Sequence, residues 1–299
     1  MNIAAGNWRR QWSMLAVKPL VLMGTFMAAA ALAAASLRAG AVSPAAFSFP
    51  TAVQQGSLII GRVAPDIKAV RYGSRLLRIS PEGWVVLGVG RSAVAPIDID
   101  VVTQTGQVGQ AHISITPRDW PVDYVSGVPP KTVAPPPAIA KRIEREQAQV
   151  AAARLQDDAR TDFARPFIWP VKGRISGRFG HQRVYNGVPG APHSGIDIAA
   201  PNGTPVRAPA SGRVTFAAPD LYLTGGTLLI DHGQGVSSNF LHLSRIDVMP
   251  GHYVQQGQVI GAVGATGRAT GPHLHWGVTW FDTRLDPLLV LETTKTMPK

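Results

Sequence analysis

The sequence predicts a mainly β protein built, in chain order, from a small β-sandwich-like domain, a helical connector and a larger β domain. Among 299 residues there are 31 Gly and 25 Pro, and they separate short runs rich in β-branched residues. Hydrophobic residues make up 45% of the chain and charged residues 16%, so the composition supports packed cores and not a disordered chain. The stretch 138–160 lacks both Gly and Pro and is the clearest helical exception.

The N-terminal segment reads as an export signal. Arg9, Arg10 and Lys18 precede an uncharged apolar stretch, 19–37, and small residues follow at 39–41. The apolar stretch also reaches the minimum length of a membrane span, roughly 17 to 20 residues. Residues 1–41 are therefore predicted to be a signal peptide or a membrane anchor. In either case the rest of the chain is expected outside the cytoplasm, in a periplasm or at the outer face of an inner membrane.

The next segment, 42–120, is predicted to form the small β domain. Turn signals at short intervals separate its β-rich runs, a pattern typical of an antiparallel sandwich. These runs are 57–63, 68–72, 76–79, 84–89, 97–103 and 110–115. The domain has one histidine and no acidic cluster. We interpret it as a binding or positioning module.

Residues 121–165 are predicted to be a Pro-rich linker followed by a helix. The linker, 121–137, reads PVDYVSGVPPKTVAPPP and is expected to be extended. The helix, 138–160, carries Ile139, Ile143 and Val150 along one side. Such a helix can serve a partner or dimer contact, or it can pack as a surface helix on its neighbour. The sequence does not choose between them, and the oligomeric state stays unassigned.

The last segment, 166–299, is predicted to be an all-β domain. Its clearest strands are 206–208, 212–217, 227–231, 236–240 and 274–280. The chain contains no cysteine, which excludes disulfides, Cys-ligated metals and thiol nucleophiles. Any metal must therefore be held by His and carboxylates. The net charge of +11 suits an anionic envelope polymer or a membrane surface, and no recognisable nucleic-acid module accompanies it.

Three histidine motifs stand out in this domain. His273 and His275 alternate along a predicted strand, so both side chains point to one face and both can serve a metal. His193 and Asp197, in the segment HSGID, offer an imidazole and a carboxylate. His242 lies alone between two leucines, where a structural histidine is the usual interpretation. Each motif by itself is weak, and only the combination favours a metal site.

With these residues in view, the domain resembles the lysostaphin-type (LytM-like) zinc endopeptidases of bacterial peptidoglycan. That family carries H-x-x-x-D, a lone H and H-x-H in this order, as this chain does. The sequence between the motifs also matches that of the family, at Gly203-Thr204-Pro205-Val206, at 257–261 and at Thr270-Gly271-Pro272. The resemblance covers about 175–287, under half of the chain. It departs from the family where Asn239-Phe240 stands in place of a Tyr that often lies near the lone His.

The resemblance implies one zinc ion per chain, bound by His193, Asp197 and His275, with the fourth position open. It implies that His242 and His273 are the catalytic pair. We expect further residues beside these motifs to line the substrate groove, namely Arg183, Tyr185, Asn186, Arg268 and Thr270.

The function implied is that of a zinc-dependent endopeptidase that hydrolyses peptide stems or cross-links of peptidoglycan. The alternative is a non-catalytic or latent wall-binding protein that activates other cell-wall hydrolases. A latent form would need a preceding segment that covers the groove. A lipoyl-type carrier is disfavoured because such a domain needs an exposed lysine, and no lysine occurs between 173 and 294.

Overall fold

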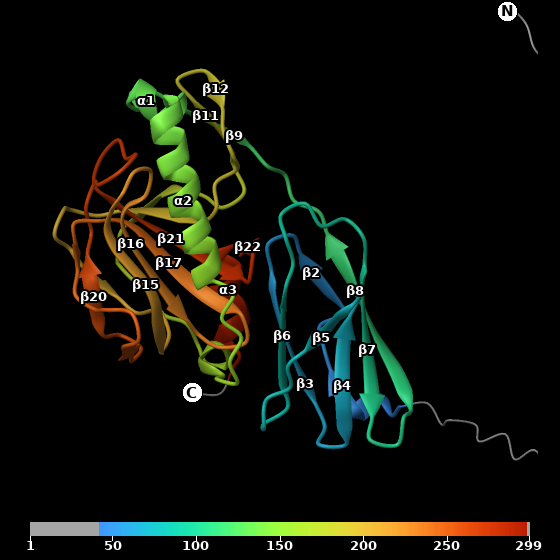
Figure 1. The fold of residues 1–299 in the computed structure, drawn as a ribbon. Helices are drawn as coiled ribbons and strands as arrows, with labels where there is room; N and C mark the ends of the chain where they lie inside the picture. Colours follow the sequence, from blue (N-terminus) through green and yellow to red (C-terminus); the bar gives the residue numbers. More distant parts are fainter. Residues whose placement is uncertain (1–41, 298–299) are drawn as a thin grey trace, which may run out of the picture. The chain divides into compact units, whose positions relative to one another are not determined.

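The computed structural model describes residues 42–297, and the predicted signal or anchor segment, 1–41, lies outside this range. In the range described, no helix is long and apolar enough to cross a membrane. The described chain is mainly β, which confirms the predicted fold class (Figure 1).

The small N-terminal domain is built from two sheets. A short 3-10 helix, η1 (Pro44–Ala46), precedes them. The first sheet has the strand order β1 (Phe47–Ser48), β3 (Leu58–Val63) and β6 (Trp84–Gly88). The second has the order β2 (Ala52–Gln54), β8 (Val108–Thr116), β7 (Ile97–Thr103), β4 (Ile67–Tyr72) and β5 (Arg75–Leu77). Along β7 the buried residues alternate, because successive side chains of a strand point to opposite faces.

The connector contains more regular structure than an extended spacer. Strand β9 (Val122–Val125) pairs in parallel with β11 (Gln182–Tyr185), whose other neighbour is β12 (Val188–Pro189). A short helix, α1 (Pro130–Val133), follows. The Pro-rich sequence contains no local signal for β9. This strand forms by pairing with β11, which lies about sixty residues further along the chain.

The long helix α2 spans Pro137–Ala153 and ends earlier than the predicted 138–160. Tertiary contacts compete with helix formation beyond that point. The Asp158 carbonyl accepts a hydrogen bond from the Gln234 amide, and Arg160 pairs with the buried Asp231. Residues 158–160 are thereby held against the C-terminal sheet, and the 3-10 helix η2 (Asp162–Ala164) continues this contact.

The C-terminal domain is centred on an eight-stranded sheet. Its order is β10 (Arg174–Gly177), β13 (Ile196–Ala199), β21 (His273–Trp280), β17 (Val236–Leu243), β16 (Gly225–Asp231), β15 (Gly212–Leu221) and β19 (Tyr253–Val254), with β22 (Thr283–Leu285) paired to β21. A smaller sheet has the order β14 (Pro205–Arg207), β20 (Val259–Ala262) and β18 (Arg245–Ile246). The chain ends in α3 (Pro287–Lys295), capped by the Asp286 side chain.

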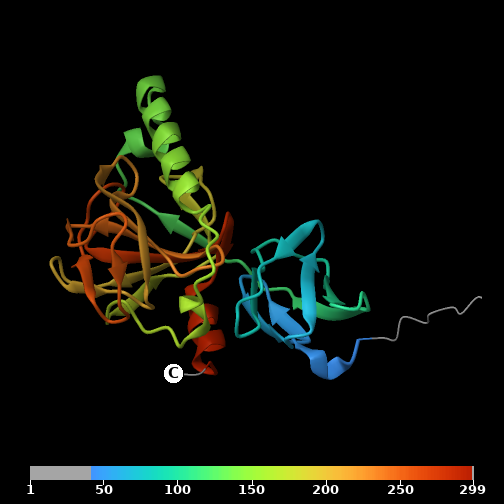
Figure 2. The same ribbon diagram turned by 60° about the horizontal axis from the view of Figure 1, so that its bottom comes forward.

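Helix α2 runs across the sheet that contains β15, β16, β17 and β21 (Figures 1 and 2). None of its residues is fully buried, and its half-buried side carries Ile139, Ile143, Glu146 and Val150. The Glu146 carboxylate anchors it by accepting from the Tyr222 amide at 2.8 Å and from Arg142 at 2.6 Å. The helix therefore rests on the sheet without being part of the core.

Candidate metal site and groove

The pairing of β13 with β21 brings the first two site residues together. In this antiparallel pair Asp197 lies opposite His275, so the two side chains share one face of the sheet. Asp197 Oδ1 lies 2.9 Å from His275 Nδ1. Two motifs almost eighty residues apart in sequence thus converge because the strands that carry them are neighbours.

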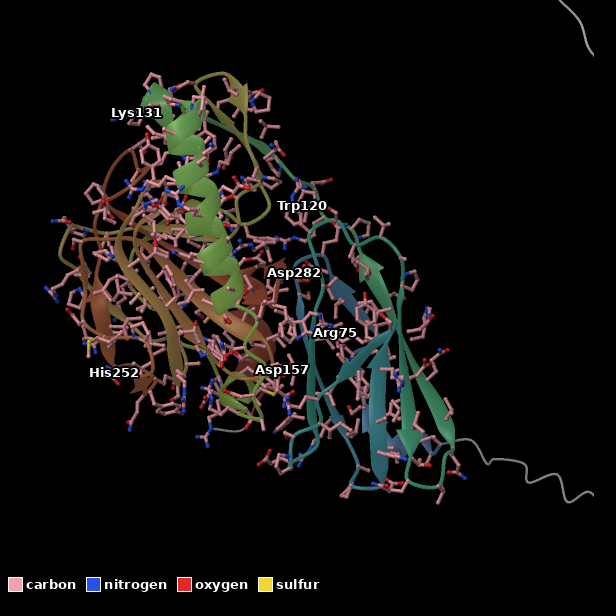
Figure 3. All side chains as sticks on the ribbon, in the orientation of Figure 1. Arg75, Trp120, Lys131, Asp157, His252 and Asp282 are labelled. Carbon is pink, nitrogen blue, oxygen red and sulfur yellow. The ribbon has the colours of Figure 1, made fainter. Side chains whose placement is uncertain are left out.

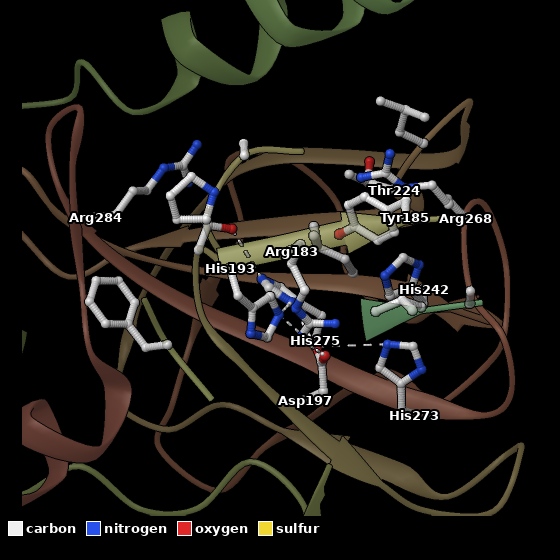
Figure 4. Close-up of a pocket in the computed structure, with 18 of the residues that line it drawn as sticks. Arg183, Tyr185, His193, Asp197, Thr224, His242, Arg268, His273, His275 and Arg284 are labelled. Atoms are coloured by element: carbon white, nitrogen blue, oxygen red, sulfur yellow. Dashed lines mark hydrogen bonds and ion pairs between the residues drawn. The ribbon is translucent and has the colours of Figure 1, made fainter. Parts of the chain in front are cut away.

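His193 reaches the same point from the loop that precedes β13. Its Nδ1 lies 2.9 Å from the Arg178 carbonyl and donates to it, which leaves the lone pair of Nε2 free. That Nε2 lies 3.0 Å from Asp197 Oδ1 and 2.9 Å from His275 Nδ1. All three side chains are buried at their contact (Figure 4).

Asp197 is held as a carboxylate. Burial alone would raise its pKa, but the close contacts to the imidazoles of His193 and His275 outweigh burial and hold the pKa well below its ordinary value. The other carboxylate oxygen, Oδ2, accepts from the Arg183 guanidinium at 2.9 Å. Burial lowers the pKa of His275 to about 4, so this imidazole is neutral near pH 7.

These three side chains could hold a metal ion. Ligand atoms of a tetrahedral zinc site lie about 2.0–2.1 Å from the ion and hence about 3.3 Å from one another. The three atoms here are separated by 2.9–3.0 Å, close to that arrangement. Two imidazoles and one carboxylate are a ligand set that suits zinc, and the cluster offers three protein side chains, the number found in hydrolytic sites.

His242 and His273 form a second pair beside the cluster. Their ring centroids are 4.8 Å apart. Nδ1 of His242 donates to the Thr266 carbonyl at 2.7 Å, and Nδ1 of His273 donates to the Gly271 carbonyl at 2.8 Å. Both Nε2 atoms are turned away from these carbonyls, and in a neutral ring each would be the position without a proton. Burial, assisted by His273 and His275, lowers the pKa of His242 to about 3.

The backbone of His242 is unusual. Its φ is +63°, in the left-handed region that non-glycine residues seldom adopt. The position lies within a register shift between β16 and β17, where Leu228 pairs with Phe240 and Gly226 with Leu243. Such bulges re-aim a side chain next to a functional site. The irregularity explains how a histidine that the sequence places between two leucines can face the groove.

The cluster and the histidine pair lie in an open groove of about 1050 Å³. Among the expected substrate contacts, Tyr185, Arg268 and Thr270 line this groove, and the Arg268 guanidinium lies 4.2 Å from the centroid of the Tyr185 ring. Asn186 is not among the lining residues, because its side-chain amide donates to the Val128 carbonyl and fixes the connector. Arg183 lines the groove but is turned towards Asp197.

Two features of the site could not be read from the motifs. The pairing of Arg183 with Asp197 depends on Gly177, where a side-chain Cβ would collide with both partners. Arg284, which also lines the groove, comes from β22 and carries no local motif. His232, in contrast, is fully buried away from these residues, and its ring nitrogens lie 2.7 Å from the Ser211 carbonyl and 2.9 Å from Ser238 Oγ.

Comparisons with known proteins place this site in a family. The sequence profile of Peptidase family M23 matches residues 191–287, which include the metal cluster and the histidine pair. The chain is 43% identical over 111 residues to the Vibrio cholerae peptidoglycan DD-endopeptidase ShyA, covering 36% of this chain and 26% of that protein. It is 50% identical over 84 residues to the Neisseria meningitidis DD-carboxypeptidase/endopeptidase Mpg, covering 28% of this chain and 19% of that protein. The chain thus spans less than a third of the length of these relatives.

A solved structure extends the similarity beyond the histidine motifs. A Pseudomonas aeruginosa protein assigned to peptidase M23 is 33% identical, with a TM-score of 0.60, and the match covers 79% of this chain and 94% of that one. The similarity therefore includes much of the chain before the metal cluster. From its fold, its site and this match, the chain belongs to peptidase family M23.

Proposed function

We propose that this protein is a zinc-dependent endopeptidase that hydrolyses peptide stems or cross-links of bacterial peptidoglycan. The observation that carries the proposal is the convergence of His193, Asp197 and His275 on one point, with His242 and His273 beside it in an open groove. The names of the relatives, which include peptidoglycan DD-endopeptidases, support peptidoglycan as the substrate. One zinc ion per chain is expected.

His193 Nε2, His275 Nδ1 and Asp197 Oδ1 would hold the metal. A bound zinc ion polarises carbonyl groups and lowers the pKa of water to about 7. Arg183 keeps Asp197 oriented by binding its second oxygen, and the Arg178 carbonyl fixes the tautomer of His193. Such outer hydrogen bonds usually strengthen metal binding and orient the ligands.

His242 and His273 are proposed to move the protons. Each keeps its Nε2 available to the groove, because each Nδ1 donates to a backbone carbonyl. A neutral imidazole can accept a proton from attacking water and return it to the leaving amine, a role that contributes about 10²- to 10⁴-fold to a rate. The low pKa of His242 keeps this residue in the basic form near neutral pH.

The alternative, a non-catalytic wall-binding protein that activates other hydrolases, would not require this arrangement. Binding alone needs neither three buried ligands nor a strained backbone at His242. The complete set of site residues therefore favours catalysis. Export to the periplasm or to the outer face of an inner membrane, with the N-terminal segment as signal or anchor, completes the proposal.

The proposal is tested by incubating the purified, zinc-loaded protein with intact sacculi and analysing released fragments by mass spectrometry. We expect muropeptide fragments whose masses identify a hydrolysed peptide bond. The matched control is His252→Ala, since His252 is exposed and lies away from α2 and the groove (Figure 3). Release of glycan fragments only, or of nothing, would contradict the proposal.

A further inference from the structure

Two arginines lie where the groove continues beneath α2. Between this helix and the sheet is a cleft of about 440 Å³, here called the helix cleft. It is lined by Gln147 and Val150 of α2, by the C-cap residue Arg154, and by Ser194, Asn239 and Arg284 below. Gln147, Ser194 and Arg284 also line the groove, so the two spaces are continuous. Arg284 therefore faces both the groove and the helix cleft.

Both guanidinium groups are poorly neutralised, and the charge of Asp282 only partly offsets the effect of burial on the pKa of Arg284. Within residues 42–297 neither Arg154 nor Arg284 forms an ion pair, and the buried Arg154 Nε has no hydrogen-bond partner. Burial lowers the pKa of both, and the nearby charge of Arg284 helps to bring the pKa of Arg154 to about 9. Two unpaired cations at close range in a partly dry site are costly unless an anion joins them.

The sheet below offers further polar groups. Opposite Arg284 in β22 lies Thr279 of β21, and opposite Thr279 lies Ser237 of β17. Both hydroxyls are buried without a hydrogen-bond partner among the described residues, and so is Asn239 Oδ1. Side chains directly opposite in antiparallel strands share a face, and Thr279 shares the face of His275 because they are four residues apart. Polar side chains therefore extend along the sheet from His193, Asp197 and His275 to Arg284.

We propose that Arg284 and Arg154 bind a carboxylate of the peptide that occupies the groove. A guanidinium binds a carboxylate through two parallel hydrogen bonds, which matches a free carboxylate and not an amide. Arg284 lies on the side of the cluster opposite His242 and His273, so the carboxylate belongs to the end of the peptide remote from that pair (Figure 4). The inference rests on the proposed function and adds a substrate feature to it.

The strand register gives an estimate of the distance between the bound carboxylate and the peptide bond that is to be cut. Four residues separate His275 from Thr279, which corresponds to about 14 Å along a strand. An extended peptide advances roughly 3.4 Å per residue, so this span covers about four residues, and the long Arg284 side chain shortens it. The carboxylate is therefore expected about two to four residues from the scissile bond.

The test uses the full-length, zinc-loaded protein and pairs of synthetic peptides that differ only in a free carboxylate or its amide, two, three or four residues from the scissile bond. A charge-assisted bidentate contact predicts about a 10- to 100-fold higher kcat/KM for the free carboxylate in one pair, mostly through KM. Arg284→Gln should abolish this preference, while Arg284→Lys should retain part of it. Arg213→Gln, at an exposed arginine of β15, should leave both rates unchanged.

A binding measurement separates this inference from the proposed function. Calorimetry on His242→Ala should show about tenfold or more tighter binding of the carboxylate peptide than of its amide, and the double variant His242→Ala/Arg284→Gln should lose the difference. Equal binding of both peptides overturns the inference even if sacculi are cleaved. A preserved difference with no cleavage by the wild-type protein overturns the proposed function alone.

If Arg284 served only to stabilise the fold, its replacement would lower the Tm without changing the peptide preference. The inference predicts the opposite. Replacement of an unpaired buried charge by a neutral group usually leaves stability unchanged or raises it. We expect the Tm of Arg284→Gln and of Arg154→Met to equal or exceed that of the wild-type protein. Lower Tm values with an unchanged peptide preference would overturn the inference.

Discussion

Each histidine of the proposed catalytic pair is held through Nδ1 by a backbone carbonyl, and this contact fixes which ring nitrogen faces the groove. The Thr266 and Gly271 carbonyls fix the tautomers of His242 and His273. The sequence predicted these two residues, together with His193, Asp197 and His275, through the order of the motifs. It could not predict the carbonyl partners, because they depend on loop conformation, nor the left-handed φ at His242, which depends on the bulge in β17.

A different residue, His232, gives a prediction for stability. Burial lowers its pKa to about 4, below the ordinary value of 6.5. The unfolded chain then binds a proton more readily than the folded chain between these pH values, so this contribution is complete above about pH 6.5 and is lost as pH falls towards 4. Between pH 7 and pH 5 the wild-type protein should lose about 2 kcal/mol more free energy of unfolding than His232→Gln.

Urea unfolding of both proteins at the two pH values measures this difference. His252→Gln serves as the control, because an exposed histidine should not alter the pH dependence. If the wild-type protein and His232→Gln show the same change with pH, folding does not lower the pKa of His232.

Among the secondary-structure elements, the register between β13 and β21 brings Asp197 and His275 together. The strands that were predicted lie within a few residues of observed strands, because alternating burial and turn residues are local signals, but about half of the observed strands were not predicted. The pairing of β13 with β21 and of β9 with β11 was not predictable, since it depends on contacts distant in sequence. Helix α2 was predicted too long for the same reason, as residues beyond Ala153 bind the sheet instead.

A glycine in β10 gives the prediction at this scale. Gly177 lies opposite Asp197, and an added Cβ would collide with the carboxylate and with the Arg183 guanidinium. Gly177→Ala should displace the carboxylate and weaken zinc binding by about 10- to 100-fold, as losses of outer support to a metal ligand do. Competition titration with a chelating dye measures the affinity.

The matched control is Gly90→Ala, at a glycine that also lines the groove. There the nearest atom to an added Cβ is Thr283 Cγ2 at 3.7 Å, an ordinary contact. Zinc affinity should be unchanged in this variant. Equal affinities of the wild-type protein and Gly177→Ala would show that the Arg183 and Asp197 geometry does not support the metal site.

At the scale of the whole molecule, segments ahead of the predicted peptidase domain contribute to its structure. Phe163 is fully buried, and Arg160 pairs with Asp231, although the sequence placed the domain start at 166. The small β domain contacts the C-terminal domain through Arg118 and Asp286, 2.9 Å apart. The composition and the spacing of motifs predicted the order of the two domains and the connector. The contacts between them depend on tertiary packing, which no local sequence pattern predicts.

Residues from several parts of the chain line the groove. Its lining includes 90–93 of the small β domain, Val125 and Val128 of the connector, and Gln147 of α2. The small β domain was interpreted from sequence as a positioning module, and its place in the groove lining is consistent with that interpretation. Mutations in these segments are therefore expected to affect substrate selection more than metal binding.

In the proposed mechanism, His193, Asp197 and His275 bind zinc, while His242 and His273 transfer protons. The most direct test measures zinc content by mass spectrometry of the metal, together with release of muropeptides, for Asp197→Ala, His242→Ala and the control His252→Ala. The account predicts that Asp197→Ala loses both zinc and cleavage, and that His242→Ala keeps one zinc per chain with cleavage reduced about 10²- to 10⁴-fold. Retention of full cleavage by His242→Ala, or of full zinc by Asp197→Ala, would contradict it.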